Sequence, residues 1–413
     1  METMVERGCG LDIGEETVVA CLMVGGAGQK VRKEVRTYRT FTADLERMRD
    51  WLRAEGCTHV AMESTGPYWV PVYVVLEQAG CFELVVGNAQ HMRNVPGRKT
   101  DVKDADWVAR LLRHGLIRKS FVPGKAFRDL RDLLRYRRGL VEAGSTERNR
   151  LLKVLETANI KLACVASDVF GVSGRRMLKA LLRGDATPEE MAQLAQGRLR
   201  HKRASLELAL RGSLDQHHRC MLQMQLQRIE RTEEDVKALD AAIDARLEPY
   251  RLQHELLMQI PGVEWLVAAV IIAELGVDMT VFPSVRHASA WAGVCPGNNQ
   301  SGGKAKTAPV RKGNVYLKTA LVQAALGAAR TGGSYYKNKY FRLRARRGAK
   351  RAAVAIAHKL LIAAYHVLST GTPYMELGEL YLDRRNRRAV ASNLVHRLKR
   401  LGYIVQIAPA VSA

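Results

Sequence analysis

The seven cysteines of the chain form no CxxC pair, and this absence excludes two classes of protein. They are spread from Cys9 to Cys295 with neither the spacing of zinc ligands nor the density of a disulfide framework. We therefore expect reduced thiols in a cytoplasmic protein. The amino-terminal stretch METMVERGCG also lacks the apolar core of a secretion signal.

Long uninterrupted apolar runs are missing as well. The run over 266–277 is too short to span a bilayer and contains Glu274, and the run over 352–369 is interrupted by two histidines and Lys359. We expect a soluble protein without a membrane partner. At 413 residues, of which 47% are hydrophobic, the chain is long enough for two or three packed domains.

Acidic residues are scarce in the last third of the chain. Residues 302–413 contain 3 Asp and Glu against 22 Lys and Arg, so they carry +19 of the net charge of +24. This imbalance predicts a polyanionic partner, either nucleic acid or an anionic membrane surface. Aromatic and basic side chains mix over 335–351, which favours nucleic acid because phosphates and unstacked bases are held by such segments. The residues expected to bind it are Lys304, Lys306, Arg311, Lys312, Lys337, Lys339, Arg342, Arg344, Arg346 and Arg347.

The first third of the chain is predicted to form an α/β domain. Its apolar side chains alternate in short stretches, which indicates strands, and an amphipathic helix interrupts them. Three strands, a helix, a strand, a helix, a strand and a last helix are the element order of the RNase H fold. The expected strands are 5–14, 17–24, 30–40, 59–63 and 82–87, and the expected helices are 42–55, 68–79 and 100–114.

Four acidic residues stand at three places in that order. Asp12 lies in the first strand, although strands disfavour aspartate, and Glu63 ends the fourth strand. Asp101 and Asp104 are three residues apart at the start of the last helix, which places both on one face, whereas Asp106 would face away from Asp104. Because clustered carboxylates repel one another unless a cation neutralises them, the set predicts a divalent-metal site. The alternative is four unrelated surface acids.

The middle of the chain is predicted to be helical. Residues 127–162 are rich in leucine, and apolar residues recur every seven positions over 216–247, which indicates a coiled-coil seam. This seam could pair with the 127–162 helix of the same chain or with a second subunit. Residues 256–276 predict two helices joined by a Pro-Gly turn. They form either a helix-hairpin-helix, whose turn amides receive a phosphate, or an ordinary core hairpin.

Ser301 lies in a loop rich in glycine and lysine. Gly302 and Gly303 follow it directly, and then come Lys304 and Lys306. Glycines let a backbone come close to a ligand, and the lysines suit a phosphate beside the hydroxyl. A serine in such a loop is more often a turn residue, so the loop alone is compatible with either role.

Five motifs occur in one order: GLDIG, HVAMESTGPYW, GRKTDVKDADWVARLL, IPGVEWLVAAVIIAELG and AWAGVCPGNNQSGGKAKT. In this combination the chain resembles the DEDD transposases of insertion sequences. These are RuvC-like enzymes joined to a serine-bearing transposase domain, and they are described as bridge-RNA-guided recombinases. The resemblance implies a RuvC-like, RNase H-fold metal-binding domain over 1–125 and a long helical coiled-coil region over 126–250. It further implies a mostly α-helical, serine-bearing domain with a helix-hairpin-helix-like segment over 251–370 and a basic tail over 371–413.

The resemblance also implies an activity, the cleavage and strand exchange of insertion-sequence DNA. Ser301 would attack a phosphate to form a phosphoserine intermediate, while Asp12, Glu63, Asp101 and Asp104 would hold Mg²⁺, for which Mn²⁺ could substitute. The implied partners are double-stranded DNA, a structured guide RNA and further copies of the chain in a dimer or tetramer. The implied location is the cytoplasm, at the nucleoid. Two alternatives stay open: an RNase H-type metal nuclease that resolves branched DNA by water attack, and a non-enzymatic nucleic-acid-binding scaffold.

Overall fold

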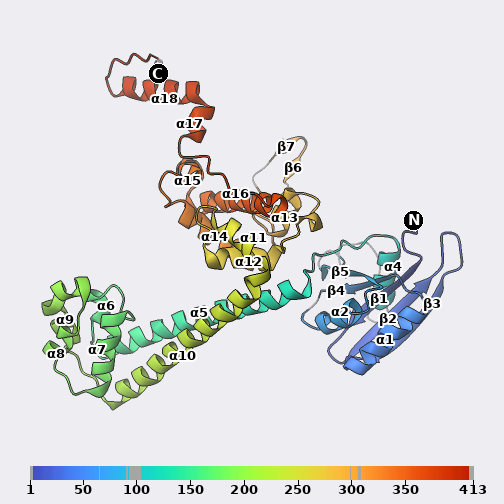
Figure 1. The fold of residues 1–413 in the computed structure, drawn as a ribbon, viewed down its shortest axis with the longest axis horizontal. Coiled ribbons are helices and arrows are strands. Elements are labelled where there is room, and N and C mark those ends of the chain that lie inside the picture. The colour runs from blue at the N-terminus through green and yellow to red at the C-terminus, as the bar shows by residue number, and fades with distance from the viewer. Residues whose placement is uncertain are drawn as a thin grey trace. The chain divides into compact units, whose positions relative to one another are not determined.

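A computed structural model describes residues 3–64, 66–89, 92, 104–297, 299–305 and 308–408 of the chain. The chain divides into two compact units, Met1–Val122 and Pro123–Ala413 (Figure 1), called unit 1 and unit 2 below. The expected division into four regions remains a prediction.

Unit 1 is built on a five-stranded sheet with the order β3-β2-β1-β4-β5. The first three strands pair in antiparallel fashion, and β4 and β5 join β1 in parallel. The expected strands and their order are confirmed, and the pairing is that of an RNase H-like α/β fold. The strands are β1 (Arg7–Ile13), β2 (Thr17–Val24), β3 (Arg32–Arg39), β4 (His59–Glu63) and β5 (Glu83–Gly87).

Helices cover both faces of this sheet. On one face, Cys9 and Leu11 of β1 share a core with α1 (Thr42–Ala54) and α2 (Trp69–Glu77). On the other face lies α4 (Asp104–Arg113), whose apolar side chains pack on β2, β4 and β5. Because successive strand residues point to opposite faces, the residues of β1 that face α4 are Gly8, Gly10 and Asp12.

Gly10 determines how closely α4 approaches the sheet. A Cβ atom at Gly10 would lie 2.2 Å from the backbone nitrogen of Ala109 and 2.4 Å from the carbonyl oxygen of Ala105. At Gly8, two positions earlier on the strand, the neighbour is instead Leu112 near the other end of the helix. The helix therefore runs along β1 with its amino-terminal end towards Asp12.

Unit 2 begins with two long helices, α5 (Lys125–Thr157) and α10 (Gln216–Leu247), which pack side by side in antiparallel directions. Arg137 of α5 contacts Asp240 of α10 at 3.2 Å, and Arg148, further along α5, contacts Glu233 at 2.6 Å. The helical periodicity over 216–247 therefore finds a partner within the same chain. Coiled-coil geometry of this pair stays a prediction.

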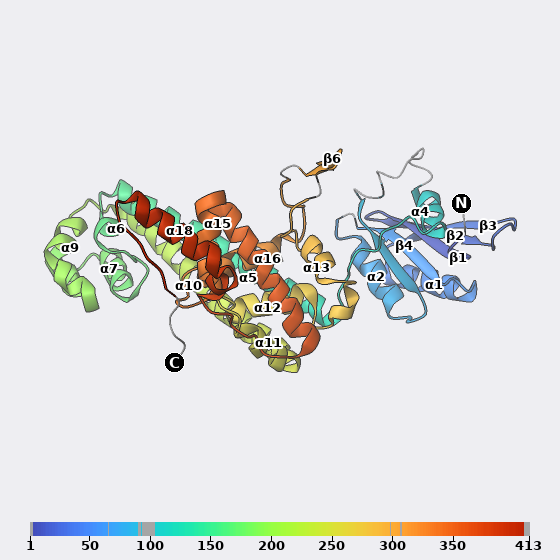
Figure 2. The same ribbon diagram turned by 90° about the horizontal axis from the view of Figure 1, so that it is seen from above.

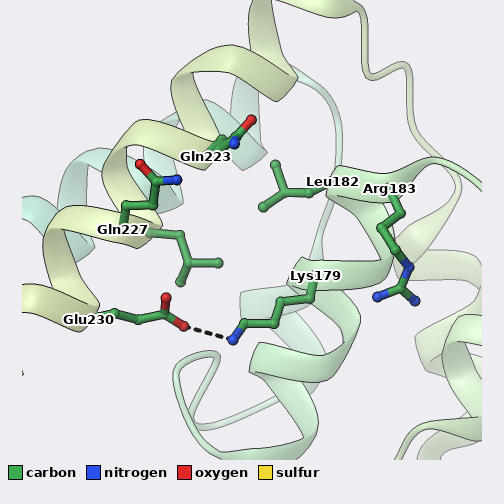
Figure 3. Close-up of a pocket in the computed structure, with 7 residues that line it drawn as sticks. Lys179, Leu182, Arg183, Gln223, Gln227 and Glu230 are labelled. Carbon is green, nitrogen blue, oxygen red and sulfur yellow. Dashed lines mark ion pairs between the residues drawn. The ribbon is translucent and has the colours of Figure 1, made fainter.

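A small helical subdomain joins the far ends of α5 and α10. Its core includes Leu162, Met177 and Leu206, packed against leucines of both long helices. A groove of about 320 Å³ lies between α7 (Val172–Arg183) and α10, and Lys179 and Glu230, which line it, form an ion pair at 2.9 Å. Figure 3 shows this pair. The subdomain contains α6 (Leu162–Val165), α7 (Val172–Arg183), α8 (Pro188–Gln193), η2 (Gly197–Lys202) and α9 (Arg203–Leu210).

The rest of unit 2 packs around α16 (Ala349–Thr370). Among the described residues, α16 alone is long and apolar enough to cross a membrane, but it contacts α11, α13, α14 and α15 and buries eight of its side chains. The other elements are η3 (Glu248–Tyr250), α11 (Arg251–Met258), α12 (Trp265–Leu275), η4 (Met279–Val281), α13 (Val285–Trp291), α14 (Val315–Ala328), α15 (Tyr335–Arg347), α17 (Tyr381–Arg385) and α18 (Arg387–Arg400).

The turn between α11 and α12 packs against α14. Gly262 has a φ of 81°, and a Cβ there would lie 2.2 Å from the carbonyl oxygen of Ala324. The glycine is thus required both by the backbone conformation and by helix packing. This contact favours the core hairpin of the two interpretations, and a phosphate-binding role for the turn stays a prediction.

Replacement of Gly10 tests the packing of α4. Gly10→Ala should lower the free energy of unfolding of the chain by about 3 kcal/mol, because the methyl group overlaps the backbone of α4 at Ala105 and Ala109. Gly14→Ala is the matched control, since its Cβ would meet only the carbonyl oxygen of Thr17 at 3.5 Å. Denaturant unfolding followed by circular dichroism measures both variants. Equal stability of the two would contradict the packing described here.

Candidate functional site

Two of the four predicted acidic residues lie side by side on the sheet of unit 1. Leu11 of β1 pairs in parallel with Met62 of β4, so the next residues, Asp12 and Glu63, are neighbours in the same register. Adjacent strands lie roughly 4.8 Å apart. Both side chains point to the face that α4 covers, and both are partly exposed. The pair fits a hard divalent cation, for which carboxylate oxygens are the preferred ligands.

The other two predicted acids belong to the beginning of α4. Asp104 is the first residue of the helix, at the end that approaches Asp12, and it is partly buried. Asp101 lies outside the described residues. Within the residues that the structure describes, no three His, Cys, Asp or Glu side chains are close enough to hold a metal ion together. Joint binding of a metal by the four acids remains a prediction.

Asp106 occupies a different environment. It is buried, its carboxylate contacts Lys33 of β3 at 2.8 Å and Arg110 at 3.0 Å, and it lies next to the thiol of Cys21. Burial, with a smaller contribution from Asp106, raises the pKa of Cys21 to about 11. Asp106 thus ties α4 to the antiparallel edge of the sheet.

Ser301 lies next to the tip of a narrow β-ribbon in unit 2. Strand β6 (Gln300–Ser301) pairs with β7 (Lys304–Ala305), and Gly302 and Gly303 between them have φ angles of 55° and 76°. Two central residues with positive φ are typical of a type I′ turn, which is why both are glycines. Ser301 is therefore the last strand residue before the turn.

The ribbon leaves room around its tip. Ser301 is exposed, and a Cβ atom on Gly302 or Gly303 would meet nothing within 4 Å among the described residues. At the root of the ribbon, the end away from the turn, the backbone N–H of Gly297 donates a hydrogen bond to the carbonyl oxygen of Pro309 at 2.9 Å. Figure 2 shows β6 standing away from α13. The Ser301 side chain is therefore accessible at the described surface of unit 2.

The root of the ribbon is held by close backbone contacts. A Cβ on Gly293, whose φ is 68°, would lie 2.9 Å from the backbone nitrogen of Gly313. Asn314, which follows Gly313, caps α14: its side-chain oxygen accepts a hydrogen bond from the backbone N–H of Leu317 at 3.0 Å. Its side-chain nitrogen donates a hydrogen bond to Oε2 of Glu274 at 2.7 Å. Glu274 is thereby connected to the ribbon through a single residue.

Glu274 is a buried carboxylate that forms ion pairs or hydrogen bonds with three side chains. Only 2% of the residue is exposed, and besides Asn314 it contacts Arg131 at 2.9 Å and Arg135 at 3.0 Å, both from α5. Burial lowers the pKa of Arg131 to about 10, an effect that the charge of Glu274 opposes. The guanidinium of Arg131 also lies over the ring of Trp291 at 5.7 Å. We call these residues (Glu274, Arg131, Arg135 and Asn314) the Glu274 cluster.

Sequence reasoning missed the Glu274 cluster. The sequence signal for it is Glu274 itself, a glutamate inside the apolar helix α12 that stands out only as an interruption of a hydrophobic run. Because a buried charge requires a partner, Glu274 in α12 predicts cationic side chains on a neighbouring helix. The sequence did not indicate which of the many arginines would supply them.

The predicted nucleic-acid-binding residues occupy two surfaces of unit 2. Arg311 and Lys312 are exposed near the root of the ribbon, and nothing is described for the Lys304 side chain or for Lys306. On α15, Arg344, Arg346 and Arg347 are exposed, Lys337, Lys339 and Arg342 are partly buried, and Arg342 pairs with Asp383 of α17.

The aromatic residues of α15 need a correction. We expected them to stack on unpaired bases, but Tyr336 and Tyr340 are buried in the helical core with 3% and 6% exposure. Their spacing of four places both on the inner face of the helix. Phe341 is 48% exposed and remains available for stacking.

Two family models match separate parts of the chain. Residues 9–160 match a DEDD transposase model of IS110, described as a transposase, and residues 254–341 match the transposase IS116/IS110/IS902 family. The first segment contains all four predicted acids and the second contains Ser301. The resemblance to transposases of insertion sequences is confirmed at this level, and a DEDD transposase segment implies an RNase H-like fold and suggests dependence on a divalent metal.

One curated relative is similar over a shorter stretch. The chain is 31% identical over 125 residues to y4pF/y4sB, a candidate transposase of Sinorhizobium fredii. The similarity covers 29% of this chain and 32% of that protein, so the chain spans about a third of the relative's length.

Loss of the Glu274 carboxylate should destabilise unit 2 strongly. Glu274→Ala leaves Arg131 buried without its ion-pair partner, so we expect the free energy of unfolding to fall by about 3–5 kcal/mol. Asp129→Asn is the control, because it breaks an exposed pair with Lys125 and should cost less than about 1 kcal/mol. Chemical denaturation compares the two variants with the parent. A cost for Glu274→Ala no larger than that of the control would show that the cluster does not hold unit 2 together.

Proposed function

We propose that this transposase of the IS110 family cuts and rejoins insertion-sequence DNA with Ser301 as its nucleophile. The observation that carries the proposal is the position of Ser301, exposed at the end of a ribbon whose two turn glycines could each carry a Cβ atom without meeting a described atom within 4 Å. A structural serine would be expected to cap a helix or bond a neighbouring backbone group, as Ser334 does in this chain. The placement of Ser301 suits a hydroxyl that has to meet a large substrate.

The reaction conserves the number of phosphate ester bonds. The Ser301 oxygen bonds to the scissile phosphorus and gives up its proton, while the bond from phosphorus to the departing sugar oxygen breaks and that oxygen gains a proton. A hydroxyl of the second DNA strand then attacks the phosphoserine, which restores a DNA phosphodiester and frees the serine. No nucleotide triphosphate is needed, because the energy of the broken bond stays in the enzyme–DNA link.

A neutral serine hydroxyl is a weak nucleophile and needs help. Residues 294–311 contain no Asp, Glu or His that could act as its base. We therefore assign activation of the reaction to the acids of unit 1, which would hold Mg²⁺ or Mn²⁺. They are Asp12, Glu63, Asp101 and Asp104. The bound cation would offset negative charge on the reacting phosphate.

The partners follow from the charge of unit 2 and from the chemistry. Lys and Arg outnumber Asp and Glu by 22 to 3 in residues 302–413, which suits double-stranded DNA together with a structured guide RNA. Exchange between two duplexes requires several strand cuts, and each phosphoserine link occupies one serine until its strand is rejoined. The working enzyme is therefore proposed to be a dimer or tetramer acting at the nucleoid.

A metal nuclease is the second candidate. The side-by-side arrangement of Asp12 and Glu63 favours it, because this pair on an RNase H-like sheet does not depend on Ser301. In that case water attacks the phosphate and the cut ends stay free. Among the described residues, no contact favours a binding scaffold without activity.

Trapping of a covalent intermediate tests the role of Ser301. Incubation with nicked insertion-sequence end DNA, flanking RNA and Mg²⁺, followed by denaturation, should leave DNA attached at residue 301. Mass spectrometry of the digested protein locates the attachment. Ser301→Ala should abolish adduct and cleavage, whereas Ser205→Ala, which removes another exposed hydroxyl, should retain both. Cleavage without adduct by Ser301→Ala would select the metal nuclease.

Substitution of the strand acids tests the metal site. Asp12→Asn and Glu63→Gln should each reduce DNA cleavage by at least about 100-fold while leaving nucleic-acid affinity and thermal stability nearly unchanged, because each removes a charge but little volume. Asp50→Asn removes an exposed carboxylate from α1 and should cleave normally. Removal of divalent metal by a chelator should abolish cleavage by the parent enzyme. Full activity of Asp12→Asn would refute the assignment.

A further inference from the structure

Three cationic side chains line one face of α15. Lys339, Arg342 and Arg346 are three and four residues apart, a spacing that places them in one row along a helix. The buried Tyr336 and Tyr340 lie about a quarter of a turn away around the helix, so the row runs beside the face that packs on the core. Arg346 is exposed, and Lys339 and Arg342 are partly buried, so the row lies at the surface of unit 2.

Two further helices add cations to this row. Lys359 of α16 and Arg385 of α17 are both exposed, and α15 packs against both helices. Burial lowers the pKa of Lys339, and the charges of Lys359, Arg346, Arg342 and Arg385 lower it further. Each of the other four cations is therefore close enough to Lys339 to repel its charge.

One acid lies within this cluster. Asp383 of α17 forms an ion pair with Arg342, and their side chains remain 30% and 38% exposed. Of the five cations, Arg342 has a carboxylate partner, and no ion pair is formed by the other four within the described residues. Five positive charges against one negative charge leave the cluster uncompensated in the free protein.

We propose that Lys339, Arg342, Arg346, Lys359 and Arg385, the α15–α17 cradle, bind the phosphodiester backbone of a nucleic acid. The proposal rests on the proposed function in one respect, that the protein acts on nucleic acid. Phosphates would relieve the repulsion between Lys339 and the other four cations and take up ion pairs that the protein itself does not supply. Contacts of this kind fix the position of a strand and do not read its sequence. Phe341, exposed on the same helix beside Arg344, offers a surface for an unpaired base.

Asp383 acts as an internal competitor in this cradle. Its carboxylate holds the Arg342 guanidinium in the free protein, as a phosphate oxygen would in the complex. Binding of a strand then exchanges one anion for another at Arg342. The consequence is that removal of the Asp383 charge should strengthen binding, although it breaks an ion pair of the folded protein.

The first test removes the two cations that come from α16 and α17. The Lys359→Gln/Arg385→Gln double variant should bind at least one of three fluorescent nucleic acids (duplex DNA, single-stranded DNA or structured RNA) at least about tenfold more weakly at 0.15 M salt. The slope of log affinity against log salt should fall by about two units, because two phosphate contacts are lost. The matched control is Lys350→Gln/Arg388→Gln, which removes the same charge from exposed positions outside the cradle. An equal loss in both double variants would overturn the proposal.

The second test uses Asp383→Asn, with Glu379→Gln as a control for the same change in net charge at an exposed position. Asp383→Asn should tighten binding severalfold and more than the control does, and its thermal stability should be unchanged or slightly lower. If Asp383 merely holds α17 in place, Asp383→Asn weakens binding, and that result would refute the cradle. A gain equal to that of Glu379→Gln would refute it as well.

Separate arms with duplex DNA, single-stranded DNA and structured RNA identify the source of the phosphates. If the Lys359→Gln/Arg385→Gln variant loses affinity for one of the three nucleic acids alone, that result supports the cradle and identifies its ligand. If it loses affinity for none of them, the cradle is refuted. These binding assays need no catalysis. A covalent adduct at Ser301 would thus stand even if the cradle fails, and the cradle would stand if no adduct forms.

Discussion

The buried carboxylate of Glu274 is the interaction on which the arrangement of unit 2 depends. It lies in an apolar helix, and two arginines of α5 and the capping residue of α14 satisfy it. Its partners thereby join the long helix α5, the hairpin helix α12 and the root of the ribbon that carries Ser301. A buried ion pair is not by itself a gain over apolar packing, but loss of one partner is costly, so Glu274 requires Arg131, Arg135 and Asn314 to lie beside it. Glu274 therefore specifies where the ribbon starts more than it adds to total stability.

Local pattern was sufficient to predict the sheet of unit 1. Successive side chains of a strand point to opposite faces of the sheet, and this alternation in the sequence locates all five strands within about two residues. The neighbouring positions of Asp12 and Glu63 also follow from element order, because both strands belong to the parallel centre of the sheet. The close approach of α4 was not predictable, since it depends on what packs over Gly10 and not on the glycine itself.

The features that the sequence could not reveal are those that depend on distant partners. The pairing of Arg131 with Glu274 spans more than a hundred residues, and no periodicity points to it. The burial of Tyr336 and Tyr340 likewise reflects which face of α15 meets α16, whereas their mixture with basic residues suggested exposure. Ser301 illustrates the same limit on a short scale. Its two glycines were attributed to ligand approach, and they turn out to satisfy a turn that requires positive φ at both positions.

The central claim is that a serine oxygen, and not water, attacks the scissile phosphate. The most direct measurement is cleavage of donor DNA in water labelled with oxygen-18, followed by mass spectrometry of the phosphate at each cut and rejoined position. Serine attack draws no oxygen from the solvent before rejoining, so the account predicts unlabelled phosphates throughout the recombinant product. Incorporation of one labelled oxygen at each donor cut, with no DNA attached at Ser301, would contradict it, because water would then be the nucleophile that cuts the strand.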